Sequence, residues 1–190
     1  MKDLMELEDE KYSELYKNGY PHSSPEYVIR RNGYDKNQYV CDLGCGMAEA
    51  AKYFNKYVGV DVSKYAIEQN IINFNNDKNK KFYHSPLNNL GFLKNEHFNL
   101  VLVLDVMEHL YPDDIDDALN EISKLNADIF AFHISLVPSV RYDKNGNNLH
   151  LSLYNENVWI EKLKKYFKPA VSRSIRLEYH ISVEIKPIKR

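Results

Sequence analysis

Gly44 and Gly46 follow a short apolar run, and an acid, Asp61, closes the next apolar run. The first segment reads Val40-Cys41-Asp42-Leu43-Gly44-Cys45-Gly46, and the second reads Val58-Gly59-Val60-Asp61. The two glycines permit a tight turn and leave no side chain across the end of the strand. A carboxylate at the end of the neighbouring strand can accept hydrogen bonds from both hydroxyls of a ribose. This order of strand, glycine turn, helix, strand and acid predicts a pocket for a ribose-bearing cofactor.

The charges around the turn favour a cationic cofactor over a pyrophosphate. A dinucleotide-binding motif needs a third small residue at the position where this chain has Glu49, and a carboxylate there would repel phosphates. Asp42 adds negative charge at the end of the first strand. S-adenosylmethionine (SAM) carries a sulfonium and an ammonium, whereas NAD carries two phosphates. SAM is therefore the predicted cofactor, and an NAD-dependent enzyme is a less favoured alternative.

At this point the sequence resembles the class I SAM-dependent methyltransferases. Asp42-Leu43-Gly44-Cys45-Gly46 is similar to the first motif of that family, and Asp61 falls on its ribose-binding acid. Residues 98–110 resemble the fourth strand and following loop, and the similarity extends over roughly residues 35–168. It implies a Rossmann-like, doubly wound α/β fold with a mostly parallel seven-stranded sheet and an antiparallel C-terminal strand.

The resemblance also implies how the chain is organised and which residues contact the cofactor. The length of 190 residues fits a single domain over residues 1–190. Within it, the resemblance implies a helical N-terminal lid at 1–34 and a SAM-binding core at 35–190. Ala48 replaces a further glycine of the family. The acid that contacts adenine is absent, and Ser85 stands in its place. The expected cofactor contacts are Asp42, Gly44, Cys45, Gly46, Asp61, Val62, Ser85, Asp105 and Tyr16.

Histidines in the predicted loops are candidates for the base that methyl transfer to a hydroxyl requires. His109 lies in the loop after the fourth strand, where open α/β sheets place ligands. His150 lies after the fifth strand, in a segment where Asn145-Gly146 predicts a hairpin over 140–153. We expect His109, His150 and Glu108 to form the catalytic group. The product from the cofactor would be S-adenosylhomocysteine.

The remaining histidines have weaker support, and metal ligation is only an alternative hypothesis. His133 lies inside a predicted buried strand and has a structural interpretation. The sequence offers no supporting context for His22, His84, His97 or His180.

In similar methyltransferases of ubiquinone biosynthesis and small-RNA modification, the loop after the fourth strand holds a divalent metal. Glu108, His109 and His150 could do so here, although the first choice assigns no metal.

Apolar periodicity predicts the elements that position these residues. Strands are expected at 39–43, 57–62, 81–84, 99–104, 129–136, 173–177 and 180–186. Helices are expected at 48–54, after the N-cap Ser63, after Pro112 with its cluster of acids, and around Trp159. Two helical pieces around Pro21 and Pro25 precede them. The alternation of strands and helices predicts an α/β domain with a mostly parallel sheet.

The composition restricts the partners. Lys+Arg 25 nearly balances Asp+Glu 27, which argues against general nucleic-acid binding and against membrane binding. Cys41 and Cys45 are interpreted as reduced packing residues, and no signal peptide is visible, so a cytoplasmic location is expected. The predicted function is methyl transfer to a small-molecule acceptor, at a hydroxyl oxygen. The alternative is a catalytically silent protein that binds SAM or a partner, and the oligomeric state is not predicted.

Overall fold

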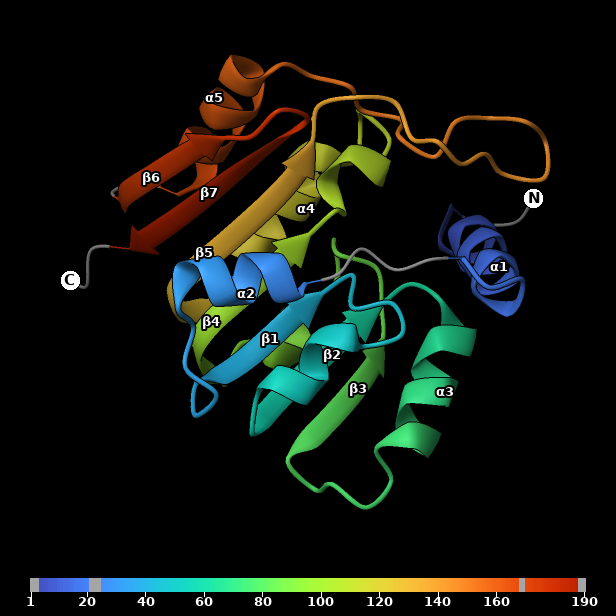
Figure 1. Cartoon of the computed structure of the whole chain (residues 1–190), viewed down its shortest axis with the longest axis vertical. Helices are drawn as coiled ribbons and strands as arrows, with labels where there is room; N and C mark the ends of the chain where they lie inside the picture. Colours follow the sequence, from blue (N-terminus) through green and yellow to red (C-terminus); the bar gives the residue numbers. More distant parts are fainter. Residues whose placement is uncertain (1–3, 21–24, 168–169, 188–190) are drawn as a thin grey trace. The chain divides into compact units, whose positions relative to one another are not determined.

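The computed structural model describes residues 4–20, 25–167 and 170–187 and divides into two compact units. Unit 1 is Met1–Leu87 and unit 2 is Asn88–Arg190, and the two are described separately (Figure 1). The organisation of residues 1–190 as one domain stays a prediction.

Unit 1 contains a parallel three-stranded arrangement with the strand order β3-β2-β1. Leu43 is paired with Val60, and Asp61 is paired with His84, so the carboxyl ends of the three strands lie together. Every residue of β1 is buried, as expected for a central strand of a parallel sheet. The elements are α1 (Leu4–Lys17), α2 (Glu26–Asn32), β1 (Tyr39–Leu43), the 3₁₀ helix η1 (Glu49–Tyr53), β2 (Lys56–Asp61), α3 (Lys64–Asn73) and β3 (Lys80–His84).

Unit 2 contains the strand order β4-β5-β7-β6, in which β4 and β5 are parallel. The C-terminal strand β7 is antiparallel to both of its neighbours. The elements are η2 (Gly91–Leu93), β4 (His97–Leu104), η3 (Met107–His109), α4 (Ile115–Ser123), β5 (Asn126–Ser135), α5 (Glu156–Tyr166), β6 (Ala170–Arg176) and β7 (His180–Pro187).

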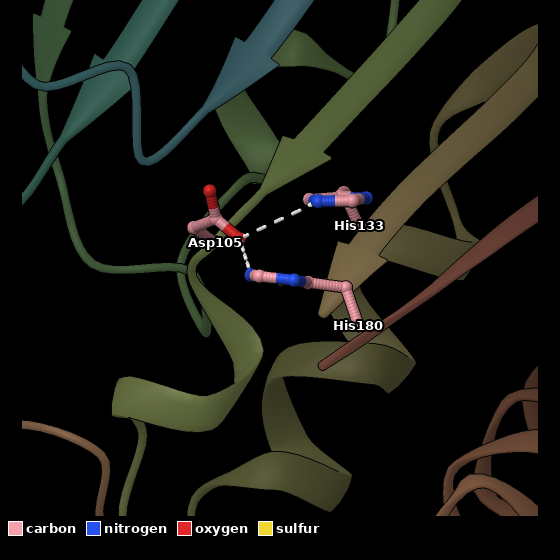
Figure 2. Close-up of side chains that lie close together, drawn as sticks. All are labelled: Asp105, His133 and His180. Atoms are coloured by element: carbon pink, nitrogen blue, oxygen red, sulfur yellow. Dashed lines mark ion pairs between the residues drawn. The ribbon is translucent and has the colours of Figure 1, made fainter. Parts of the chain in front are cut away.

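The strand register of unit 2 brings three polar side chains together. Leu104 at the end of β4 is paired with His133 of β5, and Ser135 of β5 is paired with His180 at the start of β7. Asp105 follows Leu104 directly, and its amide donates to the His133 carbonyl at 2.8 Å. Figure 2 shows its carboxylate facing the imidazoles of His133 and His180.

The predicted fold class is confirmed. The described residues contain seven strands, mostly parallel, and the C-terminal strand is antiparallel. The N-cap role of Ser63 is confirmed, since its hydroxyl accepts from the Ala66 amide. The helix after Pro112 buries the apolar face that its spacing predicted. The two N-terminal helices are also present, although Pro21 lies outside the described residues.

The helix predicted at 48–54 differs from the structure. Only a 3₁₀ helix forms there, and it begins at Glu49 because Ala48 has a left-handed backbone with φ of 55°. A side chain in that conformation costs about 1–2 kcal/mol, which is why glycine is favoured at such a position.

The hairpin predicted at 140–153 is confirmed by an antiparallel bridge between Tyr142 and Asn148. Within the described ranges, none of the helices has the length and apolar character that crossing a bilayer requires.

Candidate functional site

The glycine turn of unit 1 is held against β2 by two backbone hydrogen bonds. The amides of Gly44 and Cys45 both donate to the Val60 carbonyl, at 2.7 and 3.0 Å. Gly44 and Gly46 have positive φ angles of 75° and 49°, which glycine adopts at little cost. The turn predicted from the sequence therefore forms at the carboxyl end of β1, with its backbone next to the end of β2.

Asp61 ties the end of β2 to this turn. Its Oδ2 accepts from the Gly46 amide at 2.7 Å, and its Oδ1 accepts from the Ser63 amide at 2.8 Å. Burial raises the pKa of Asp61 to about 6, and the bonds from Ser63 and Gly46 oppose that rise. Each carboxylate oxygen has a second lone pair, so the group retains acceptor capacity for ribose hydroxyls.

Asp42 is buried beside the same turn. Its Oδ2 accepts from the Tyr57 hydroxyl at 2.6 Å. Burial raises the pKa of Asp42 to about 7, the Tyr57 bond opposes the rise, and the charge of Asp61 adds to it. The turn is thus accompanied by two buried carboxyl groups, which favours a cation over an anion as its ligand.

The raised pKa of Asp42 predicts a pH-dependent stability. The unfolded chain ionises this group near 3.8, so between about pH 4 and pH 7 the folded protein binds more protons than the unfolded chain. The free energy of unfolding should therefore fall as the pH rises through this range. Asp42→Asn keeps an acceptor for Tyr57, and we expect it to reduce the fall between pH 5 and pH 8 by at most about 3 kcal/mol, since the folded state loses this proton near pH 7. Urea unfolding at both pH values measures the difference.

Asp77→Asn is the matched control, because Asp77 is exposed and carries the same charge. It should leave the pH dependence of unfolding as in the wild type. An Asp42→Asn variant with the wild-type pH dependence would show that Asp42 is not the group that titrates.

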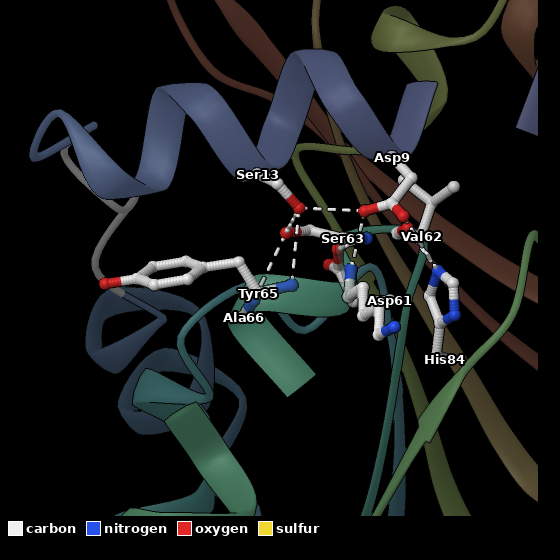
Figure 3. Close-up of polar contacts among 9 residues, drawn as sticks. Asp9, Ser13, Asp61, Val62, Ser63, Tyr65, Ala66 and His84 are labelled. Atoms are coloured by element: carbon white, nitrogen blue, oxygen red, sulfur yellow. Dashed lines mark hydrogen bonds and ion pairs between the residues drawn. The ribbon is translucent and has the colours of Figure 1, made fainter. Parts of the chain in front are cut away.

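Helix α1 caps the first turn of α3 (Figure 3). The Lys64 amide donates to Asp9 Oδ1 at 2.8 Å, and the Tyr65 amide donates to Ser13 Oγ at 3.3 Å. The hydroxyls of Ser13 and Ser63 are 2.9 Å apart. Amides of a helix's first turn have no partner within the helix. The N-terminal helix predicted as a lid is therefore held by backbone groups directly after Asp61.

Tyr16 lies over the glycine turn. A Cβ atom added to Gly46 would be only 2.7 Å from the Tyr16 hydroxyl oxygen, so glycine leaves the space that this phenol needs. Burial raises the pKa of Tyr16 well above its usual value, and the charge of Asp61 contributes. The structure thus brings Tyr16 together with Gly46 and Asp61, as the predicted cofactor set requires.

Val62 and Ser85 lie around the ends of β2 and β3. The Val62 carbonyl accepts from Nε2 of His84 at 2.9 Å, and that nitrogen is 3.7 Å from Oδ2 of Asp9. The Ser85 amide donates to the Asp61 carbonyl at 3.0 Å. His84, which had no support from the sequence, therefore links β3 to β2 and to α1.

Cys41 and Cys45 are buried free thiols. Burial raises the pKa of both thiols well above the usual value, and nearby carboxylates add to the effect. Thiols held in the protonated form are poor nucleophiles. Their interpretation as reduced packing residues is confirmed.

In unit 2 the structure brings the three predicted catalytic residues together. One ligand atom from each of Glu108, His109 and His150 lies within 4.8 Å of the others, and the two imidazole rings are 4.7 Å apart in an edge-to-face arrangement. His150 Nδ1 lies 2.6 Å from the Val137 carbonyl oxygen, which can only accept. Nδ1 therefore carries the proton, and the lone pair of the neutral ring is at Nε2. Burial lowers the pKa of His150 below 6.5.

Glu108 connects the strand end to the histidine segment. Its backbone carbonyl accepts from the amides of Leu151 and Ser152, and its Oε1 accepts from the Ser135 amide at 2.8 Å. The side chain is fully buried, and burial raises its pKa. These bonds join Glu108 to the end of β5 and to the segment that carries His150.

Asp105, His133 and His180 form a second cluster, which the sequence did not predict. Asp105 was expected at the cofactor, and here it faces two histidines of its own unit. The structural interpretation of His133 is consistent with its bond of 2.8 Å to the Ser182 hydroxyl. His180 is joined to the cluster by antiparallel pairing, a long-range contact for which the sequence contains no local signal.

The glycine turn, the acid after β2 and the mostly parallel strands define a Rossmann-like α/β protein. Residues 41–128 match the sequence profile of a family described as "Methyltransferase domain". This match confirms the resemblance to class I methyltransferases, and it includes the turn, Asp61 and the segment after β4. No curated protein is similar enough in sequence to match the chain.

Solved structures confirm the fold. The complex of DhpI with S-adenosylhomocysteine is 13% identical with a TM-score of 0.73, and the match covers 98% of each chain. The 1,6-didemethyltoxoflavin N1-methyltransferase of Burkholderia thailandensis, solved with S-adenosylhomocysteine, is 15% identical with a TM-score of 0.71, covering 100% of this chain and 92% of that one. The cyclase SpnF is 14% identical with a TM-score of 0.66, covering 86% and 80%.

Proposed function

We propose that this protein transfers a methyl group from SAM to a hydroxyl oxygen of a small molecule. The observation that carries the choice of donor is the turn at Gly44–Gly46, bonded to the buried carboxylate of Asp61. Two of the similar structures are complexes with S-adenosylhomocysteine, the product that SAM leaves after transfer. In this proposal unit 1 binds the donor through Asp61, Gly46 and Tyr16.

The structure of the turn supports SAM over NAD. A dinucleotide site binds pyrophosphate at the N-terminus of a helix. Here the turn leads only into the five-residue 3₁₀ helix η1, whose first residue, Glu49, is paired with Lys52 at 2.5 Å. The buried carboxyl groups of Asp42 and Asp61 would also oppose a pyrophosphate. The sulfonium and ammonium of SAM fit this charge pattern.

The proposed acceptor atom follows from His150. Methyl transfer to a hydroxyl requires removal of a proton, and a neutral imidazole with an available lone pair is suited to remove it near pH 7. Burial favours the neutral form of His150, and the bond to Val137 fixes its tautomer with the lone pair at Nε2. His109, whose ring lies 4.7 Å from that of His150, is the second candidate to contact the acceptor.

Two alternatives differ from this proposal, one in function and one in the group that activates the hydroxyl. A catalytically silent protein would bind SAM through unit 1 and transfer nothing. A divalent metal bound by Glu108, His109 and His150 would activate the hydroxyl in place of a free base, since ligand atoms of the three residues converge. In that case activity would be lost after chelation and restored by metal.

Calorimetry with SAM, S-adenosylhomocysteine and NAD tests the proposal. We expect the first two to bind with one site per chain and NAD not to bind. Transfer of tritiated methyl groups from SAM to a panel of small phenols and sugar alcohols then tests catalysis. Binding of NAD without binding of SAM would overturn the proposal. SAM binding without transfer to any member of the panel would favour the silent protein.

A further inference from the structure

The side chains of Asp105, His133 and His180 converge at one end of the sheet in unit 2 (Figure 2). They come from three neighbouring strands: Asp105 directly follows β4, His133 lies in β5 and His180 begins β7. The pairing of Leu104 with His133 and of Ser135 with His180 sets this arrangement. The cluster therefore rests on the backbone of a sheet, which is a rigid support for a binding site.

The distances within the cluster are too long for hydrogen bonds. Oδ1 of Asp105 is 3.8 Å from Nε2 of His180 and 4.0 Å from Nε2 of His133. This oxygen is buried and accepts no hydrogen bond from any of the residues in the described ranges. A buried polar atom without a partner is costly, so the oxygen is suited to a ligand that would fill the space between it and the imidazoles.

A metal ion has the size that this space requires. Ligand atoms about 2.1 Å from a tetrahedral ion lie roughly 3.4 Å apart, so Asp105 Oδ1 would move closer to both imidazoles and the His180 ring would rotate to bring the three atoms onto one ion. The ligand atoms of the three residues already lie within 4.8 Å of one another. Two imidazoles and one carboxylate suit zinc, iron, cobalt or nickel, and not the all-oxygen surroundings that magnesium and calcium prefer.

The surroundings orient His133 toward Asp105 as a histidine ligand is oriented in metal sites. Nδ1 of His133 is held by the Ser182 hydroxyl at 2.8 Å, which leaves Nε2 directed at Asp105. Metal-binding histidines commonly have their second nitrogen held in this way. The rings of His133 and His180 are stacked, with an interplanar angle of 10°, so both Nε2 lone pairs point at one ion only after the more exposed ring of His180 rotates. Asp105 has a φ of 53°, a strained conformation for a residue other than glycine, and such strain is concentrated at functional sites.

An ion from solution can reach the cluster. The side chain of His133 is 10% exposed, that of Asp105 is 21% exposed and that of His180 is 35% exposed. The Glu108 cluster differs, because the Glu108 side chain is fully buried and its Oε1 is already bonded to the Ser135 amide. The Asp105 cluster is therefore the better candidate for a metal site in this unit.

We propose that Asp105, His133 and His180 bind one divalent transition-metal ion of the zinc or iron type. Three protein ligands leave coordination positions for water or for a ligand oxygen or nitrogen. This inference does not depend on methyl transfer, since it rests on the geometry of unit 2 alone.

Cobalt titration of the full chain tests the proposal. Co²⁺ bound to nitrogen and oxygen ligands gives a visible absorption band, and Zn²⁺ should displace it with one equivalent per chain. We expect His180→Gln and Asp105→Asn each to weaken Co²⁺ binding at least tenfold. His97→Gln is the matched control, because His97 also faces a carboxylate, that of Asp128 at 3.3 Å, but belongs to no group of three such ligands among the described residues. It should bind Co²⁺ as the wild type does.

Thermal unfolding supplies a second measurement. Zn²⁺ should raise the unfolding midpoint of the wild type and of His97→Gln but not that of His180→Gln, whose side chain is partly exposed and whose replacement the fold should tolerate. Absence of Co²⁺ and Zn²⁺ binding by the wild type would overturn the proposal. It would also be overturned if His150→Gln abolished binding while His180→Gln left it intact, since the ion would then belong to the Glu108 cluster.

Discussion

His150→Gln is expected to reduce the rate of methyl transfer by roughly 10²–10⁴-fold while the affinity for SAM stays nearly unchanged. Burial favours the neutral form of His150, and its Nδ1–H bond to Val137 fixes the tautomer, so the Nε2 lone pair can take a proton. Gln is similar in size but cannot act as a base near neutral pH. The measurement is tritiated methyl transfer to the best acceptor of the panel, together with calorimetry for SAM.

The pH profile distinguishes a base from a merely structural residue. Because the pKa of His150 is lowered below 6.5, the wild-type rate should rise with pH on the acid side and level off by pH 7. The residual rate of His150→Gln should lack that rise. His97→Gln, at an exposed histidine in the same unit, should keep the wild-type rate and profile. Equal losses of rate and SAM affinity in His150→Gln would mean that the residue is structural.

Asp61→Ala is expected to weaken SAM binding more than tenfold. A buried carboxylate that binds ribose hydroxyls contributes on the order of 1.5–3 kcal/mol. In this structure the same substitution also leaves the amides of Gly46 and Ser63 without their acceptor, so the turn itself should loosen. Calorimetry with SAM and urea unfolding of the same variant measure the two effects.

Two further variants separate binding from folding. Asp61→Asn retains one acceptor oxygen and should lose less stability than Asp61→Ala, while SAM binding stays weak. Asp77→Ala removes an exposed carboxylate that also accepts from a backbone amide, that of Asn79 at 3.0 Å, and should leave SAM affinity unchanged. SAM binding by Asp61→Ala at the wild-type affinity would remove Asp61 from the donor site.

The parts of the fold that follow from local sequence could be predicted. The apolar runs before Gly44 and Asp61 form β1 and β2, because short apolar runs bounded by turn residues are suited to buried parallel strands. Ser63 begins α3 because its hydroxyl accepts a first-turn amide close in sequence. The 3₁₀ helix after Ala48 was missed, since the left-handed backbone at an alanine is not visible in residue spacing.

The candidate site likewise has parts that local sequence predicts and parts that depend on tertiary contacts. The sequence by itself determined the glycine turn, the acid that ends β2 and the histidines placed after strands, because each depends on residues near one another in the chain. Only the tertiary structure decided that α1 caps α3 and that His180 lies beside Asp105 and His133. Both contacts join segments dozens of residues apart in the chain. The free energy that favours such contacts comes from burial and strand register across a whole unit, which no local stretch of sequence reveals.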